Sequence, residues 1–123
     1  MRRDNLVVDI RVKTFEAEAR ARLGFLCGDF GFVGPEYEGH GGGYPVMLSL
    51  RYHRASALVE VCLVLYYGGE EYVATSLVVN REDGPRQRSQ IGSNTARTGF
   101  QMRRALDRQA AALRQALAAH PSS

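Results

Sequence analysis

The sequence predicts an α+β domain in which an antiparallel β-meander of three to four strands lies between an N-terminal helix and a C-terminal helix packed on the sheet. Two observations support this prediction. Residues 46–79 hold three strand-like runs with only short breaks between them, and strands joined by short connections pair antiparallel. Residues 98–119 place apolar side chains at helical spacing and are followed by Pro121. With 123 residues, the chain is expected to form a single domain, residues 1–123.

Side-chain pairing predicts the register of the first hairpin. If residues 54–57 form the loop, His53 faces Leu58 and the apolar residues of both strands share one face of the sheet. Arg51 then faces Glu60 on the other face as a favourable cross-strand ion pair. A loop that is one residue shorter would break this pair, so we prefer the longer loop.

The turn residues predict the register of the second hairpin. Gly68 and Gly69 suit a two-residue type I′ turn, in which both residues need positive φ. Such a turn aligns Leu65 with Tyr72 and makes residues 58–67 the central strand. Because this strand is apolar on both faces, a face that the helices leave uncovered would favour association of two copies into a homodimer.

The remaining segments give weaker patterns. The N-terminal helix is predicted over residues 15–27, with Gly28 as its end. Residues 6–12 are rich in β-branched side chains, which favours a strand, but they also continue the apolar stripe of the helix; we prefer the strand and keep the helix as the alternative. Residues 29–45 are rich in glycine and are expected to form a long connection. Residues 87–91 form a candidate fourth strand.

Composition leaves most function classes open. A net charge of +3 and a pI near 9.1 permit a nucleic-acid or membrane partner without indicating one. Cys27 and Cys62 are too few for a disulfide framework, and we expect both to be small buried apolar residues. Because the sequence shows neither a signal-peptide core nor an apolar run of membrane length, we expect a cytoplasmic protein with no membrane partner.

No pattern of residues predicts catalysis. His40 lies near Glu36 and Glu38, but a glycine-rich loop does not preorganise metal ligands, and no second cluster completes a coordination shell. The glycine-rich residues 39–43 lack the Lys-Ser/Thr pair of a phosphate-binding loop. Neither cysteine has a neighbouring base to activate its thiol. We therefore expect no enzyme activity, with no catalytic residue, cofactor or metal ion.

Tyrosine and glutamate residues predict a protein-binding surface. Tyrosine offers a large, rigid contact area with a polar tip and is enriched at interfaces. The relevant residues fall in the long connection and around the second hairpin turn. We expect a partner protein to contact Glu36, Tyr37, Glu38, His40, Tyr44, Tyr66, Tyr67, Glu70 and Tyr72.

Arginine residues in the C-terminal third predict an alternative function. Almost all positive charge in the chain is arginine, which suits contacts with phosphate and carboxylate groups. A solvated helix face is the simpler interpretation of these residues. The alternative is binding of a nucleic acid or another anionic ligand by Arg86, Arg88, Arg97, Arg104 and Arg108.

Four short motifs add a resemblance to a known kind of protein. In order along the chain they are Phe25-Leu26-Cys27-Gly28-Asp29-Phe30-Gly31-Phe32, Gly34-Pro35, Leu50-Arg51-Tyr52 and Val59-Glu60-Val61. Over residues 15–80, this order resembles small bacterial proteins of the polymorphic-toxin immunity type. The resemblance implies a protein that neutralises a toxin domain by binding it, without catalysis. Many such proteins are acidic because they cover basic nuclease sites, so the basic charge of this chain speaks against a nuclease as the toxin.

Overall fold

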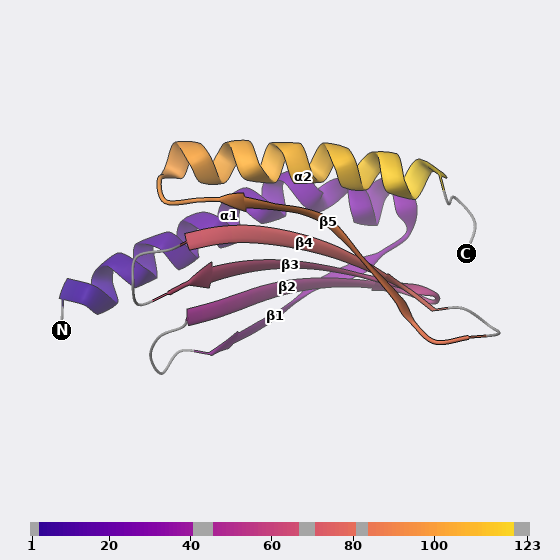
Figure 1. Ribbon diagram of the computed structural model, residues 1–123, viewed down its shortest axis with the longest axis horizontal. Coiled ribbons are helices and arrows are strands. Elements are labelled where there is room, and N and C mark those ends of the chain that lie inside the picture. The colour runs from indigo at the N-terminus through magenta and orange to yellow at the C-terminus, as the bar shows by residue number, and fades with distance from the viewer. Residues whose placement is uncertain (1–2, 41–45, 67–70, 81–83, 120–123) are drawn as a thin grey trace.

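Five strands form one antiparallel sheet in sequence order, and a helix precedes and follows them (Figure 1). The computed structural model describes residues 3–40, 46–66, 71–80 and 84–119. The predicted α+β meander between two helices is confirmed, with five strands in place of three or four. The elements are α1 (Arg3–Phe30), β1 (Val33–His40), β2 (Val46–Arg54), β3 (Ala57–Leu65), β4 (Glu71–Val79), β5 (Gln87–Thr95) and α2 (Gly99–Ala119).

Both helices pack on the same face of the sheet. α2 lies over β4 and β5, α1 lies over β1, β2 and β3, and the two helices contact each other (Figure 1). An ion pair joins the helices, with Arg22 Nε 2.6 Å from Asp107 Oδ1. In the described part of the chain, neither helix has an apolar stretch long enough to cross a membrane.

The hydrophobic core lies between the helices and the sheet. Alternate residues of the inner strands point toward the helices, because side chains along a strand alternate between its two faces. The predicted apolar stripe of α2 faces them. Among the largest fully buried side chains are Phe15, Leu26, Leu48, Leu50, Tyr52, Leu63, Leu113 and Leu117.

One polar side chain of α2 is buried in this core with its hydrogen bonds satisfied. Gln109 is only 2 % exposed. Its Nε2 donates to the carbonyl oxygen of Val73 at 2.8 Å and to Oδ1 of Asn94 at 3.0 Å, and its Oε1 accepts from Oγ1 of Thr75 at 2.7 Å. A Cβ added to Gly92 would lie 2.8 Å from Cγ of Gln109, so β5 approaches the helix closely here. These bonds offset the cost of burying an amide and fix the position of α2 on β4 and β5.

α1 begins earlier than predicted. It starts at Arg3, so residues 6–12 are helical and the preferred strand is wrong. Val12 packs against the core three residues before the fully buried Phe15. Burial of one continuous apolar stripe therefore outweighs the strand propensity of the β-branched residues.

α1 also ends later than predicted. It passes Gly28 and stops at Phe30, where the next residue, Gly31, has a φ of 74° that glycine adopts without strain. Cys27 lies on the outer side of this last turn and is exposed, while Cys62 is half-buried. The prediction that both cysteines are buried is therefore wrong for Cys27.

β1 lies within the segment that was predicted to be a connection. Residues 29–45 contain several glycines and prolines, yet Val33–His40 pairs with β2. Gly34 has a φ of 142°, and a Cβ there would lie 2.7 Å from the carbonyl oxygen of Arg51. Because β1 is an edge strand with a bulge at this point, it tolerates glycine and proline that a central strand would exclude.

The first hairpin has the predicted register. Arg51 pairs with Glu60, and Arg51 Nε lies 2.8 Å from Glu60 Oε2. Arg54 and Ala57 also pair, so the turn is shorter than the predicted loop. β5 contains the candidate strand 87–91 and continues beyond it.

The second hairpin is shifted by one residue from the predicted register. Leu65 pairs with Glu71 and not with Tyr72, while the predicted turn residues lie outside the described residues. A shift of one residue moves every side chain of a strand to the opposite face. In the observed register Val73 and Leu77 enter the core, which buries more apolar surface than the predicted alignment would.

Candidate functional site

The face of the sheet opposite the helices carries the candidate site. Side chains at alternate positions of all five strands point to this side, and no helix of the described chain packs on them. We call it the open face. It includes Glu36 and Glu38 of β1, Met47, Ser49, Arg51 and His53 of β2, Leu58, Glu60, Cys62 and Val64 of β3, Tyr72, Ala74, Ser76 and Val78 of β4, and Arg88, Gln90, Ser93 and Thr95 of β5.

A row of alternating charges crosses the middle of the open face. Arg51 Nη1 forms an ion pair with Glu38. Arg51 Nε also contacts Glu60 Oε2 at 2.8 Å, and Arg88 Nη1 lies 3.5 Å from Glu60 Oε1. We call Glu38, Arg51, Glu60 and Arg88 the charge ladder. Because its contacts join neighbouring strands, the ladder holds its side chains in one arrangement.

Glu60 is the central carboxylate of the ladder, and its side chain is only 14 % exposed. Burial alone would raise its pKa. Hydrogen bonding and Coulombic attraction from Arg51, and then from Arg88, outweigh burial and hold the pKa of Glu60 below its ordinary value of 4.5. The carboxylate is therefore charged throughout the neutral range and stabilises the folded chain there.

We expect Glu60→Gln to lower the free energy of unfolding at pH 7 by about 1–2 kcal/mol, between the values for exposed and buried pairs. Because a depressed pKa stabilises the folded state only above the unfolded pKa, this difference should shrink as the pH falls below about 4.5. Urea unfolding of both proteins between pH 3 and pH 7 measures it. Glu38→Gln, at the exposed end of the ladder, is the control and should cost less than about 1 kcal/mol at pH 7. A constant difference across the pH range would contradict the assignment.

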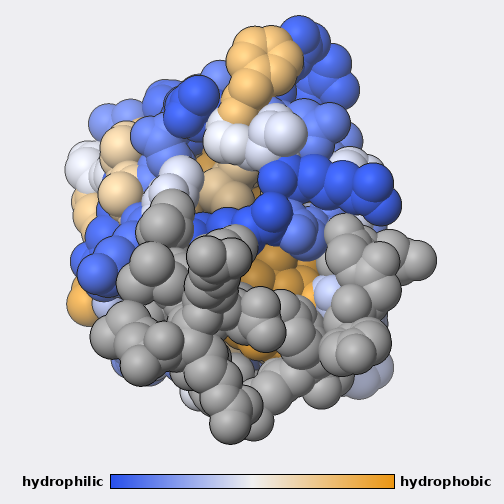
Figure 2. Space-filling view, turned by 90° about the vertical axis from the view of Figure 1, so that its left-hand side faces the viewer, coloured by the Kyte–Doolittle hydropathy of each residue, from blue (hydrophilic) through white to orange (hydrophobic). Residues whose placement is uncertain are grey.

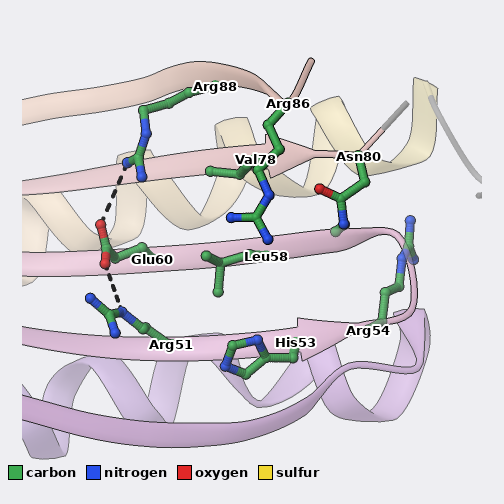
Figure 3. Close-up of a pocket in the computed structure, with 10 residues that line it drawn as sticks. Arg51, His53, Arg54, Leu58, Glu60, Val78, Asn80, Arg86 and Arg88 are labelled. Atoms are coloured by element: carbon green, nitrogen blue, oxygen red, sulfur yellow. Dashed lines mark hydrogen bonds and ion pairs between the residues drawn. The ribbon is translucent and has the colours of Figure 1, made fainter. Parts of the chain in front are cut away.

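A hollow of about 380 Å³ lies beside the charge ladder (Figure 3). Its floor is the cross-strand pair Leu58 and Val78. We call it the arginine hollow, because four of the side chains around it are arginines. Its lining residues are Arg51, His53, Arg54, Ala57, Leu58, Glu60, Val78, Asn80, Arg86 and Arg88.

The cationic groups of the hollow differ in how they are held. Arg54 Nη1 donates to the carbonyl oxygen of Phe30 at 2.9 Å, and its guanidinium lies 4.7 Å from the ring centre of Phe32. His53 Nε2 lies 3.5 Å from Oε2 of Glu36, beyond a good hydrogen bond. Arg86 makes no ion pair or hydrogen bond with any residue that the structure describes.

The opposite half of the open face is apolar. It consists of side chains from β2, β3 and β4 near the end of the molecule where α2 begins, and Figure 2 shows apolar surface between hydrophilic side chains at this end. Met47 is 41 % exposed there. Tyr66 and Tyr72 border it, with ring centres 6.0 Å apart and hydroxyl oxygens 3.4 Å apart. The remaining apolar members are Cys62, Val64 and Ala74.

The structure distributes the predicted partner-binding residues over two places. Glu36 and Glu38 lie on the open face, but Tyr37 points to the other side of β1, where it is 50 % exposed. Burial, followed by the nearby charge of Glu16, raises the pKa of Tyr37. Tyr66 and Tyr72 meet at the far end of the sheet. Tyr44, Tyr67, Glu70 and the side chain of His40 lie outside the described residues.

The arginines of the alternative function also separate into two groups. Arg86 and Arg88 line the hollow on the open face. Arg104 and Arg108 lie on α2, across the sheet, where they line a groove of about 310 Å³ with Asn94, Thr95, Gln101 and Ala105. Arg97 precedes this helix and is exposed. The sheet therefore stands between the two groups.

Sequence reasoning did not include His53 and Arg54 in any site. Both residues lie at the end of β2, and the predicted register already placed His53 beside Leu58. To place them in one site with Arg86 and Arg88, the register of β4 on β5 must be known; in this register Val78 faces Arg88. No side-chain pattern in the polar β5 sequence indicates that register.

Within the described ranges, no three potential metal-ligating side chains of His, Cys, Asp or Glu lie close enough together to hold a metal ion. Comparison of the chain with known protein families, with curated proteins and with solved structures finds no match.

Proposed function

We propose that this protein is a non-enzymatic protein-binding domain that holds its partner on the open face of the sheet. The observation behind the proposal is the placement of both helices on one side, which leaves the other side of all five strands uncovered by any described helix. An antiparallel sheet with one solvated face normally alternates apolar and polar residues. Here the open side of β3 carries the half-buried Leu58 and Cys62 and the buried Val64, at positions where a solvated face normally has polar residues.

The pattern on the open face has the composition of a recognition surface. Interfaces combine an apolar centre, which supplies most of the affinity, with polar groups at the rim. Met47 is 41 % exposed and Ala74 is half-buried, so both offer apolar area to a partner, and Tyr66 and Tyr72 border them with hydroxyl groups. The charge ladder adds fixed charges of both signs, and such charges select a partner and set its orientation more than they raise affinity.

The finer form of the proposal is an immunity-type inhibitor that neutralises a toxin domain by covering it. Its support is the resemblance over residues 15–80, together with a surface that offers contact area and fixed charges of both signs. In this form, the product of a neighbouring toxin gene is the first partner to mix with the purified chain.

We expect Ala74→Arg to abolish capture of the partner, because it places a charged side chain in the middle of the apolar half of the open face. The matched control is Ala111→Arg on the exposed side of α2. The native chain and both variants are immobilised and exposed to lysate of the source cells and to candidate toxin domains. Melting temperatures are measured in parallel and should agree within a few degrees, because both substituted side chains can reach solvent.

A partner that the native chain and Ala111→Arg retain, and that Ala74→Arg loses, supports the proposal. Equal capture by Ala74→Arg would place the interface elsewhere and contradict it. Sedimentation of the purified chain tests self-association: a dimer that Ala74→Arg dissociates would make a second copy the occupant of the open face and would overturn the proposal of a different partner protein.

A further inference from the structure

We infer that the arginine hollow binds a carboxylate group carried by the partner, on an acidic segment in which an apolar residue neighbours the acidic one. The inference rests on the proposed function, since it assigns the part of the partner that meets this end of the open face. Charge, available hydrogen-bond donors and an apolar floor support it independently of one another.

The hollow holds an excess of positive charge. Four arginines line it, and Glu60 is the only carboxylate among the lining residues that the structure describes. Both oxygens of Glu60 are already engaged, Oε2 by Arg51 and Oε1 by Arg88. Arg51 is also paired with Glu38, so the two carboxylates of the charge ladder balance the charges of Arg51 and Arg88. Arg54 and Arg86 have no carboxylate partner among the described residues of the lining. A ligand that supplies negative charge would complete the set.

Arg86 is the donor best placed to meet such a ligand. It makes no ion pair or hydrogen bond with any described residue. In Figure 3 its side chain crosses Val78 and ends above Leu58, so its guanidinium lies over the floor of the hollow. Asn80 and Arg88 stand on either side of it and add further N–H donors (Figure 3). Above an apolar floor, a charge-assisted bond from this group is stronger than one made in open water.

The floor indicates a carboxylate with an apolar neighbour in preference to a phosphate. Leu58 and Val78 pair directly across β3 and β4 and form one apolar step between the arginines. An apolar side chain next to an acidic residue of a peptide can pack on this surface. Phosphate sites typically use several backbone N–H groups at a loop or a helix N-terminus, whereas this hollow is lined by side chains that project from strands. A volume of about 380 Å³ accommodates two or three side chains of an extended segment.

Nuclear magnetic resonance titration of the labelled full chain tests the inference. The probe is an acetylated and amidated Leu-Glu-Leu-Glu-Leu peptide, and the matched peptide carries glutamine in place of glutamate. We expect the acidic peptide to bind with a dissociation constant on the order of 1 mM, because it supplies only a few contacts. The largest shifts should fall at residues 57–60 and 78–80. The glutamine peptide should bind at least about tenfold more weakly.

Two variants separate the hollow from the other cationic surface. Arg86→Gln should weaken binding of the acidic peptide by about tenfold or more. Arg108→Gln, on the far side of the sheet, should leave it unchanged. Equal binding by the native chain and Arg86→Gln would overturn the inference, and so would shifts confined to α2. No binding up to tens of millimolar would overturn it as well. Inorganic phosphate or a single-stranded oligonucleotide that binds more tightly than the peptide would assign the hollow to phosphate and overturn the carboxylate.

Failure of this inference can be told apart from failure of the proposed function. If the native chain and Arg86→Gln capture the same partner equally and the acidic peptide does not bind, the open face remains a protein-binding surface but the hollow does not contribute. If the peptide binds as expected and no partner depends on Ala74, the hollow remains a carboxylate site and the proposed function fails.

Discussion

Replacing Gln109 by glutamate is expected to lower the free energy of unfolding by about 3 kcal/mol or more at pH 7. The two side chains have the same shape, so no cavity forms. The loss comes from the hydrogen bonds, because Gln109 Nε2 donates to the carbonyl oxygen of Val73 and to Oδ1 of Asn94. A carboxylate would place an acceptor, with a negative charge, against these two oxygen atoms in a site that is 2 % exposed.

The pH dependence of Gln109→Glu distinguishes this cause from a general loss of packing. A buried carboxyl has a raised pKa, so the folded variant holds a proton that the unfolded chain releases. The loss of unfolding free energy in Gln109→Glu, relative to the native chain, should therefore be smallest near pH 4, where the protonated carboxyl group can still donate one hydrogen bond. This loss should grow as the pH rises. Gln115→Glu, on the exposed side of the same helix, serves as the control and should cost no more than about 0.5 kcal/mol at either pH. Urea unfolding at pH 4 and pH 7 gives both values; equal stability of the two variants would contradict the role of Gln109.

Gln109 also explains why the open face stays open. Gln109 lies in the apolar stripe of α2 and is the one buried polar residue of this helix in the described chain. Its side chain forms hydrogen bonds with Thr75, Val73 and Asn94. This fixes α2 on one side of the sheet. α1 packs beside it on the same side through its buried apolar side chains, and the ion pair between Arg22 and Asp107 joins the two helices at the surface.

Side-chain pairing is enough to predict one part of the sheet correctly from the sequence. The register of β2 on β3 follows from the need to pair Arg51 with Glu60, and the structure confirms both the register and the pair. The prediction for β4 was wrong because it relied on the turn type. Burial of Val73 and Leu77 decides the register there. The free energy gained by burying these two side chains exceeds the conformational preference of the turn residues.

Two other features could not be inferred from local sequence. β1 contains Gly34 and Pro35, two residue types that are unfavourable in a central strand and therefore predict a loop. β1 accepts them because it is an edge strand with a bulge at this point. The arginine hollow was missed for a related reason. It needs Arg86 and Arg88 beside His53, and these residues meet only after the polar β5 has joined the sheet.

The covered face of β2 offers a second large effect, centred on Tyr52. This side chain is 1 % exposed, under α1, directly between Arg51 and His53 of the open face. Burial, with a smaller contribution from Cys27, raises the pKa of its hydroxyl from 10.0 to about 12, although Arg20 acts in the opposite direction. The folded chain therefore keeps the Tyr52 proton at a pH where the unfolded chain has released it.

We expect the native protein to lose about 2 kcal/mol more stability than Tyr52→Phe as the pH rises from 10 to 12, because each unit of pKa difference corresponds to about 1.4 kcal/mol. Near pH 7 the two proteins should differ by less than about 1 kcal/mol, since phenylalanine preserves the packing of the ring. Urea unfolding across this range, with the ultraviolet absorbance of tyrosinate as a second readout, measures both. A parallel loss in the two proteins would mean that water reaches Tyr52, and the helices would then not seal this face. Together with Glu60, whose effect should appear below about pH 4.5, Tyr52 makes the two faces of the sheet respond at opposite ends of the pH range.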